Sequence, residues 1–124
     1  MLDDPDFLDF LRRTVRSVWG VELVLLLRRT SPRTWTSDDL VLEMRASAAI
    51  VNGALAHLEA AGLVARDADG VRYAPAAPEL DVLTAELEAC YRERPVRLVN
   101  AIVSPDEDKL KTFADAFRLK EPKP

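Results

Sequence analysis

A helix followed directly by a short hairpin, encoded by residues 47–73, constrains the fold of this chain more than any other feature. Ser47 is a favoured helix N-cap residue, and Gly62 marks the expected end of that helix. Between them, apolar residues recur at spacings of 4 and 3, as in the buried stripe of a helix: Val51, Leu55 and Leu58. Two short strands, residues 63–66 and 71–73, then flank a turn that contains Gly70. The region therefore predicts a helix–hairpin unit.

Further helices are predicted upstream of this unit. Thr36 is followed three residues later by Asp39, a variant of the capping box, which predicts a short helix through Arg45 and a tight connection to the next helix. Residues 6–29 carry a helical pattern with Gly20 as an expected break. Its second piece, residues 21–27, is apolar nearly all round, which is typical of a helix in the middle of a domain or at a dimer contact.

The C-terminal part of the chain predicts two or three further helices. Residues 79–94 carry an apolar seam at spacings of 3, 4 and 3: Leu80, Leu83, Leu87 and Cys90. Pro95 interrupts this pattern before the apolar segment 96–103. Ser104, Pro105 and Glu107 together predict another helix start. One face of that last helix is apolar through Leu110, Phe113 and Phe117.

The elements together predict a mainly α fold with a small β-hairpin. Residues 1–76 are expected to form one domain with its N-terminal helices, and residues 77–124 a helical C-terminal extension. The two apolar faces of the extension are candidate surfaces for a homodimer or a protein partner: Leu80, Leu83, Leu87, Leu110, Phe113 and Phe117. The other interpretation is that the seam packs on residues 21–27 of its own chain. We expect a dimer, because a bundle of this size has little surface with which to cover both residues 21–27 and the face of Leu110, Phe113 and Phe117.

Composition excludes several classes of function. The net charge is −4, and both halves of the chain carry slightly more acidic than basic residues, so neither half is a basic arm for nucleic acid. A single cysteine, Cys90, and a single histidine, His57, do not support a metal site, and no cofactor is expected. No nucleophile with a base and no Gly-rich phosphate loop is present, so we expect no enzyme.

The expected location is the cytoplasm. The longest apolar run, residues 21–27, is interrupted by Glu22 and falls far short of the roughly 20 residues that cross a bilayer, so no membrane association is expected. The acidic start of the chain does not resemble a secretory signal.

The phrase from Leu55 to Val64, Leu-x-x-Leu-Glu-Ala-Ala-Gly-Leu-Val, with Arg66 and Arg72-Tyr73 in the hairpin, resembles the winged helix-turn-helix family. Bacterial regulators of the MarR-like and ArsR-like kind are similar over about residues 16–76. The resemblance implies a transcription-associated regulator whose helix from Ser47 enters the major groove of double-stranded DNA while the hairpin touches the backbone or the minor groove. The DNA-binding residues that it implies are Arg45, Ser47, Ala48, Asn52, His57, Arg66 and Arg72.

The same positions support another interpretation. If Val51 and Leu55 point into the core, then Ile50 and Leu42 do not, and with Ala48, Ala49 and Gly53 they form a weakly polar surface suited to protein contact. The chain is then a protein-interaction module on a winged-helix scaffold with weak or no DNA binding. Alternatively, Ile50 covers the core. Likewise, Arg66 and Arg72 are either phosphate contacts or surface charges paired with Asp67 or Asp69.

Overall fold

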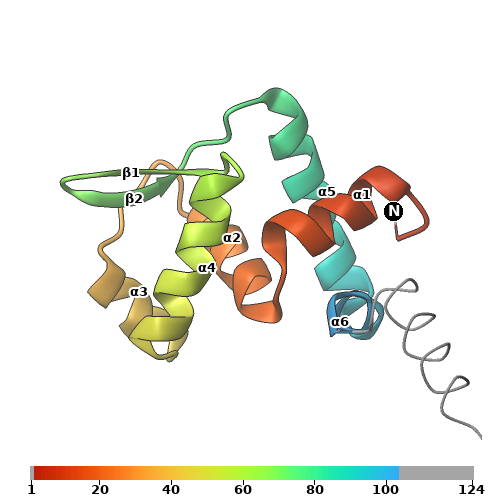
Figure 1. Cartoon of the computed structure of the whole chain (residues 1–124), viewed down its shortest axis with the longest axis horizontal. Helices are drawn as coiled ribbons and strands as arrows, with labels where there is room; N and C mark the ends of the chain where they lie inside the picture. The colour runs from red at the N-terminus through yellow and green to blue at the C-terminus, as the bar shows by residue number, and fades with distance from the viewer. Residues whose placement is uncertain (1, 104–124) are drawn as a thin grey trace, which may run out of the picture.

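A computed structural model of the chain describes residues 2–103 (Figure 1). In chain order its helical elements are α1 (Pro5–Asp9), the π-helical turn η1 (Phe10–Val15), α2 (Val18–Arg29), α3 (Ser37–Met44), α4 (Ala48–Ala60), α5 (Pro78–Glu93) and α6 (Pro95–Val103). The strands β1 (Val64–Asp67) and β2 (Gly70–Tyr73) form an antiparallel sheet between α4 and α5. The prediction of a mainly helical chain with one small hairpin is therefore confirmed. The predicted apolar face of Leu110, Phe113 and Phe117 lies outside the described residues.

Helix α2 lies at the centre of the core, as its sequence predicts. Its apolar residues are buried on several sides: Val21, Leu23, Val24, Leu25 and Leu27. It packs against α4, α5, β2 and η1, so it contacts elements from both ends of the described chain (Figure 1). A helix that is apolar nearly all round can lie only where neighbours cover it on most sides. One continuous core consequently extends from Phe7 to Leu98.

The break before α2 lies earlier than the sequence predicts. Gly20 is inside α2, whereas the helical path ends at Arg16, whose φ is +70°, and restarts at Ser17. The Ser17 hydroxyl accepts a hydrogen bond from the Gly20 N–H at 3.0 Å and so caps α2. A Cβ atom on Gly20 would lie 2.2 Å from the carbonyl oxygen of Val15. The glycine therefore permits close backbone packing instead of ending a helix.

Helices α3 and α4 are capped as predicted and joined by a short turn. The Thr36 hydroxyl accepts a hydrogen bond from the Asp39 N–H at 3.1 Å, and the Ser47 hydroxyl accepts one from the Ile50 N–H at 3.2 Å. Arg45, with φ +55°, ends α3 in the left-handed region. The predicted stripe of α4 is fully buried: Val51, Leu55 and Leu58. Gly62, with φ +78°, follows the end of α4 and permits the turn into β1.

The hairpin pairs in a single register, with Val64 opposite Tyr73 and Asp67 opposite Gly70. Its other edge is partly covered, because Trp35 and Val71 exchange two backbone hydrogen bonds of 2.8 Å. Trp35 is thus a one-residue third strand that fixes the loop before α3 to the hairpin. The loop–helix–helix–hairpin segment consequently forms one connected unit, residues 35–73.

The seam of α5 packs within its own chain. Leu87 and Cys90 are buried, and Leu80 and Leu83 are partly buried against the same core. Helix α5 thus packs against α2 of the same chain, which is the second of the two interpretations that the sequence left open. Leu87 is fully buried in this packing and is not exposed on the surface. In α6 only Leu98 is buried, whereas Val96 and Val103 are exposed. Within the described residues, no helix is long and apolar enough to cross a membrane.

Candidate nucleic-acid interface

Helices α3 and α4 and the hairpin lie on one side of the molecule, with the start of α4 beside α3 and the end of α4 beside the hairpin (Figure 1). Four of the predicted site residues are brought to this end and are exposed: Arg45, Ser47, Ala48 and Asn52. The left-handed turn at Arg45 sets the start of α4 at the surface. Because the first N–H groups of a helix lack intrahelical acceptors, this end of α4 carries partial positive charge. The arrangement leaves the first turn of α4, which carries small side chains, exposed to solvent.

His57 lies elsewhere on α4 and has a partner within the chain. The Arg16 guanidinium is 3.1 Å from Nδ1 of His57 and donates to it when that nitrogen is unprotonated. Arg16 belongs to the turn before α2, far from the hairpin in sequence. The predicted role of His57 as a phosphate contact therefore competes with an interaction that the sequence pattern did not indicate.

Both hairpin arginines are paired with carboxylates. The Nε atom of Arg66 is 3.1 Å from Oε2 of Glu59, and Nη1 of Arg72 is 2.7 Å from Oδ2 of Asp67. Asp67 was one of the partners considered in the sequence, whereas Glu59 was not. Exposed ion pairs of this kind contribute only about 0–1 kcal/mol, so a phosphate can replace the carboxylate. Even so, each arginine is locally neutralised, and the hairpin presents no net positive charge.

The surface beside the start of α4 is apolar. Leu42 of α3 is 77% exposed and Ile50 of α4 is 39% exposed. Both side chains are therefore at the surface, as the protein-contact interpretation requires. Ala48, Ala49 and Gly53 are also exposed, and their small side chains make this part of the surface flat. We call these five residues the α3–α4 apolar patch.

Arg33, in the loop before α3, is a further cation near the hairpin. Its guanidinium carbon lies 3.6 Å from the centre of the Trp35 ring, a cation–π contact. Trp35 also lines a shallow hollow of about 180 Å³ with the hairpin tip and the start of α3. An arginine two residues before a tryptophan in a short loop is the only sequence signal that indicates this contact.

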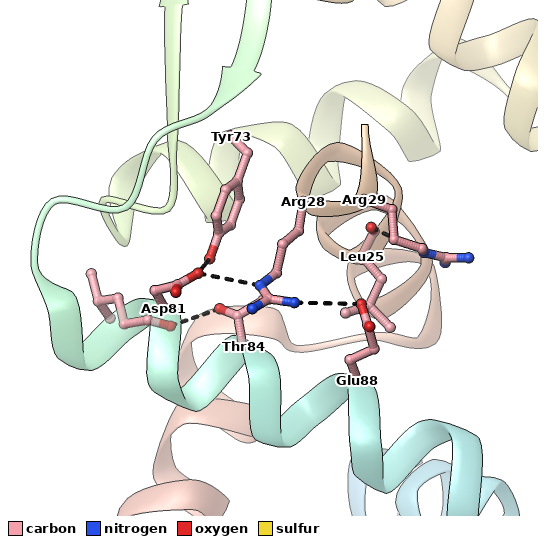
Figure 2. Close-up of polar contacts among 8 residues, drawn as sticks. Leu25, Arg28, Arg29, Tyr73, Asp81, Thr84 and Glu88 are labelled. Carbon is pink, nitrogen blue, oxygen red and sulfur yellow. Dashed lines mark hydrogen bonds and ion pairs between the residues drawn. The ribbon is translucent and has the colours of Figure 1, made fainter. Parts of the chain in front are cut away.

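A polar network connects the hairpin to α2 and α5 (Figure 2). The Tyr73 hydroxyl donates a hydrogen bond of 2.6 Å to Oδ1 of Asp81, and Nε of Arg28 is 3.2 Å from the same oxygen. Arg28 also lies 3.7 Å from Glu88, whose Oε2 is buried without a hydrogen bond among the described residues. The hydrogen bond from Tyr73, and next that from Arg28, lower the pKa of Asp81 below its usual 3.8. Burial, followed by the hydrogen bond to Asp81, raises the pKa of Tyr73.

The lowered pKa of Asp81 makes the stability contributed by this network pH-dependent. Because the folded pKa lies below the unfolded one, the stabilisation is present above about pH 4 and is lost as the pH falls through the folded pKa. Asp81→Asn should therefore lower the urea midpoint at pH 7 and have a smaller effect at pH 3. Glu43→Gln, which removes an exposed carboxylate of α3, is the control. An equal effect of Asp81→Asn at both pH values would contradict this role.

Comparison of the chain with protein-family models, with curated proteins and with solved structures found no match. The candidate interface is therefore argued from its own geometry and chemistry. Its features are an exposed helix start with an apolar patch beside it, and hairpin arginines that are paired with carboxylates.

Proposed function

We propose that this chain is a winged helix-turn-helix protein of transcription regulation in the cytoplasm, and that it contacts double-stranded DNA through the start of α4 and the hairpin. The order of elements supports the proposal: a central helix, the Trp35 bridge, two short capped helices and a hairpin. In this scaffold α4 is the recognition helix and the hairpin is the wing.

The observation that carries the proposal is the exposed start of α4, on the side of the molecule that also carries α3 and the hairpin (Figure 1). The small residues Ala48, Ala49 and Gly53 allow the helix to approach a groove wall closely, and Ser47 and Asn52 offer hydrogen-bonding groups to base edges. Arg45 has no ion pair with any described residue, so its charge is available to a phosphate. The proposed DNA contacts are therefore few. The hairpin contributes to DNA binding only when Arg66 and Arg72 leave Glu59 and Asp67 and pair with phosphates.

A second candidate function, protein contact through the α3–α4 apolar patch, is favoured by the exposure of Leu42 and Ile50. Apolar side chains at the centre of a surface are typical of protein interfaces and contribute little to phosphate binding. This candidate predicts a partner whose binding tolerates salt and is lost in Ile50→Asp.

The DNA proposal predicts binding of the full chain to fluorescent random duplex DNA with steep salt dependence. If Arg45, Arg66 and Arg72 each neutralise one phosphate, the affinity should fall roughly 40-fold between about 50 and 200 mM salt. Replacing all three arginines by alanine should abolish most of this dependence. Fluorescence anisotropy at the two salt concentrations measures both effects.

Three exposed arginines near the C-terminal end of the described residues provide the matched control: Arg92, Arg94 and Arg97. Their triple alanine variant loses the same charge and should bind DNA like the natural sequence. Equal losses in the two triple variants would indicate attraction by net charge alone. No binding at 50 mM salt would reject the DNA proposal and leave the apolar patch as the candidate site.

A further inference from the structure

A groove of about 510 Å³ lies between α1 with η1 and the first half of α5, away from the candidate interface. Its floor is apolar and is formed by Phe10, Leu80, Val82 and Leu83. Phe10 is nearly buried, but Val82 is 57% exposed. An exposed valine in a concave site leaves apolar surface in contact with water, so an apolar ligand there gains free energy by covering it.

The rim of the groove is strongly acidic. Five of its lining residues are carboxylates, Asp4, Asp6, Asp9, Glu79 and Glu86, and none is basic. Asp9 pairs with Arg13 at 2.7 Å, whereas the other four make no ion pair with a described residue. Like charges gathered around an apolar floor repel one another and attract cations. The groove consequently fits a segment that is both apolar and basic.

The chain itself contains such a segment. All four lysines of the sequence fall within residues 109–123: Lys109, Lys111, Lys120 and Lys123. With Arg118 they give residues 109–124 five basic side chains against two acidic ones. Between these cations, Leu110, Phe113 and Phe117 recur at spacings of 3 and 4, the pattern of one helix face. The segment thus has the two properties, apolar and basic, that the groove would recognise.

We propose that the groove between α1 and α5 is the docking site for residues 109–120 of the same chain. The aromatic side chains would cover the apolar floor while the lysines pair with the rim carboxylates, as when an amphipathic helix binds a groove. The five residues 104–108 between α6 and this segment can span about 17 Å when extended. The inference is independent of DNA binding.

Zero-length crosslinking by a carbodiimide tests this docking, because the reagent joins lysine amines to carboxylates and all four lysines lie within residues 109–123. The full chain is treated at low and high salt, and the crosslinked peptides are identified by mass spectrometry. The expected products join Lys109, Lys111 or Lys120 to Asp4, Asp6, Glu79 or Glu86. They should decrease at high salt, because the attraction is between exposed charges.

Two variants separate docking from random encounter. Phe113→Ser with Phe117→Ser keeps every lysine and should lower the groove crosslinks at least fivefold. Thr112→Ser with Ala116→Ser, which leaves the apolar face of Leu110, Phe113 and Phe117 intact, is the control. Crosslinks spread evenly over exposed carboxylates such as Asp38 and Glu43, or unchanged in the Phe variant, would overturn the proposal. An equal mixture of ¹⁴N and ¹⁵N chains identifies the source, since mixed-isotope products would place a second copy in the groove and reject the same-chain proposal.

Discussion

Gly20→Ala is expected to lower the free energy of unfolding by about 3 kcal/mol, although alanine is the better helix former by about 1 kcal/mol. The reason is the 2.2 Å separation between an added Cβ and the carbonyl oxygen of Val15. That oxygen belongs to the backbone, so relief requires η1 or the start of α2 to move. Both elements carry buried core residues, and the displacement would be transmitted to the core. Urea unfolding followed by circular dichroism measures the loss.

Gly53→Ala is the matched control, since Gly53 is also in a helix but an added Cβ meets no atom within 4 Å. This change should raise the free energy of unfolding by about 0.5–1 kcal/mol. If both alanine variants proved more stable than the natural sequence, that result would contradict the close contact between the Val15 carbonyl and Gly20 of α2.

Leu87→Ala is expected to lower the free energy of unfolding by about 3 kcal/mol, because Leu87 is fully buried in the core of its own chain. Removing its side chain leaves a cavity between α5 and α2 that the surrounding helices can only partly close. Since this packing is within one chain, the loss should be the same at low and high protein concentration. Urea unfolding at two concentrations about 50-fold apart measures it.

Val96→Ala is the control for this prediction, because it shortens an exposed side chain of the adjoining helix α6 and should change stability by less than about 0.5 kcal/mol. An effect of Leu87→Ala that vanished on dilution would instead place Leu87 at a dimer contact. A homodimer that leaves the core intact would use side chains of α6 that remain exposed, such as Val96 and Val103.

The helices and the hairpin could be predicted because their signals are local. Thr36 and Ser47 each accept a hydrogen bond from an N–H three residues ahead, so the cap is specified within one turn. Gly62 likewise supplies the positive φ that ends α4. The buried stripe of α4 follows from spacing alone, since residues four apart share a face of a helix.

The polar contacts of the candidate site could not be predicted in the same way, because they join residues that are distant in sequence. Arg16 meets His57, and Arg28 meets Asp81, only after α2 has packed against α4 and α5. The break at Arg16 depends on such packing too, since a left-handed arginine has no local preference for that conformation. Gly20 offered the stronger local signal for a break, and tertiary structure overrode it.

Asp81 joins the helix that lines the groove to the second strand of the hairpin. It lies between Leu80 and Val82, which form the groove floor, and it accepts the hydrogen bond of Tyr73 from the second strand of the hairpin. Any ligand that displaces the first turns of α5 must therefore stretch or break that bond and alter the freedom of the hairpin. By thermodynamic reciprocity, a ligand that fixes the hairpin changes the groove's affinity by the same factor. In that case the carboxylate of Asp81 would couple the two surfaces, and the coupling free energy would be bounded by the strength of its hydrogen bond with Tyr73.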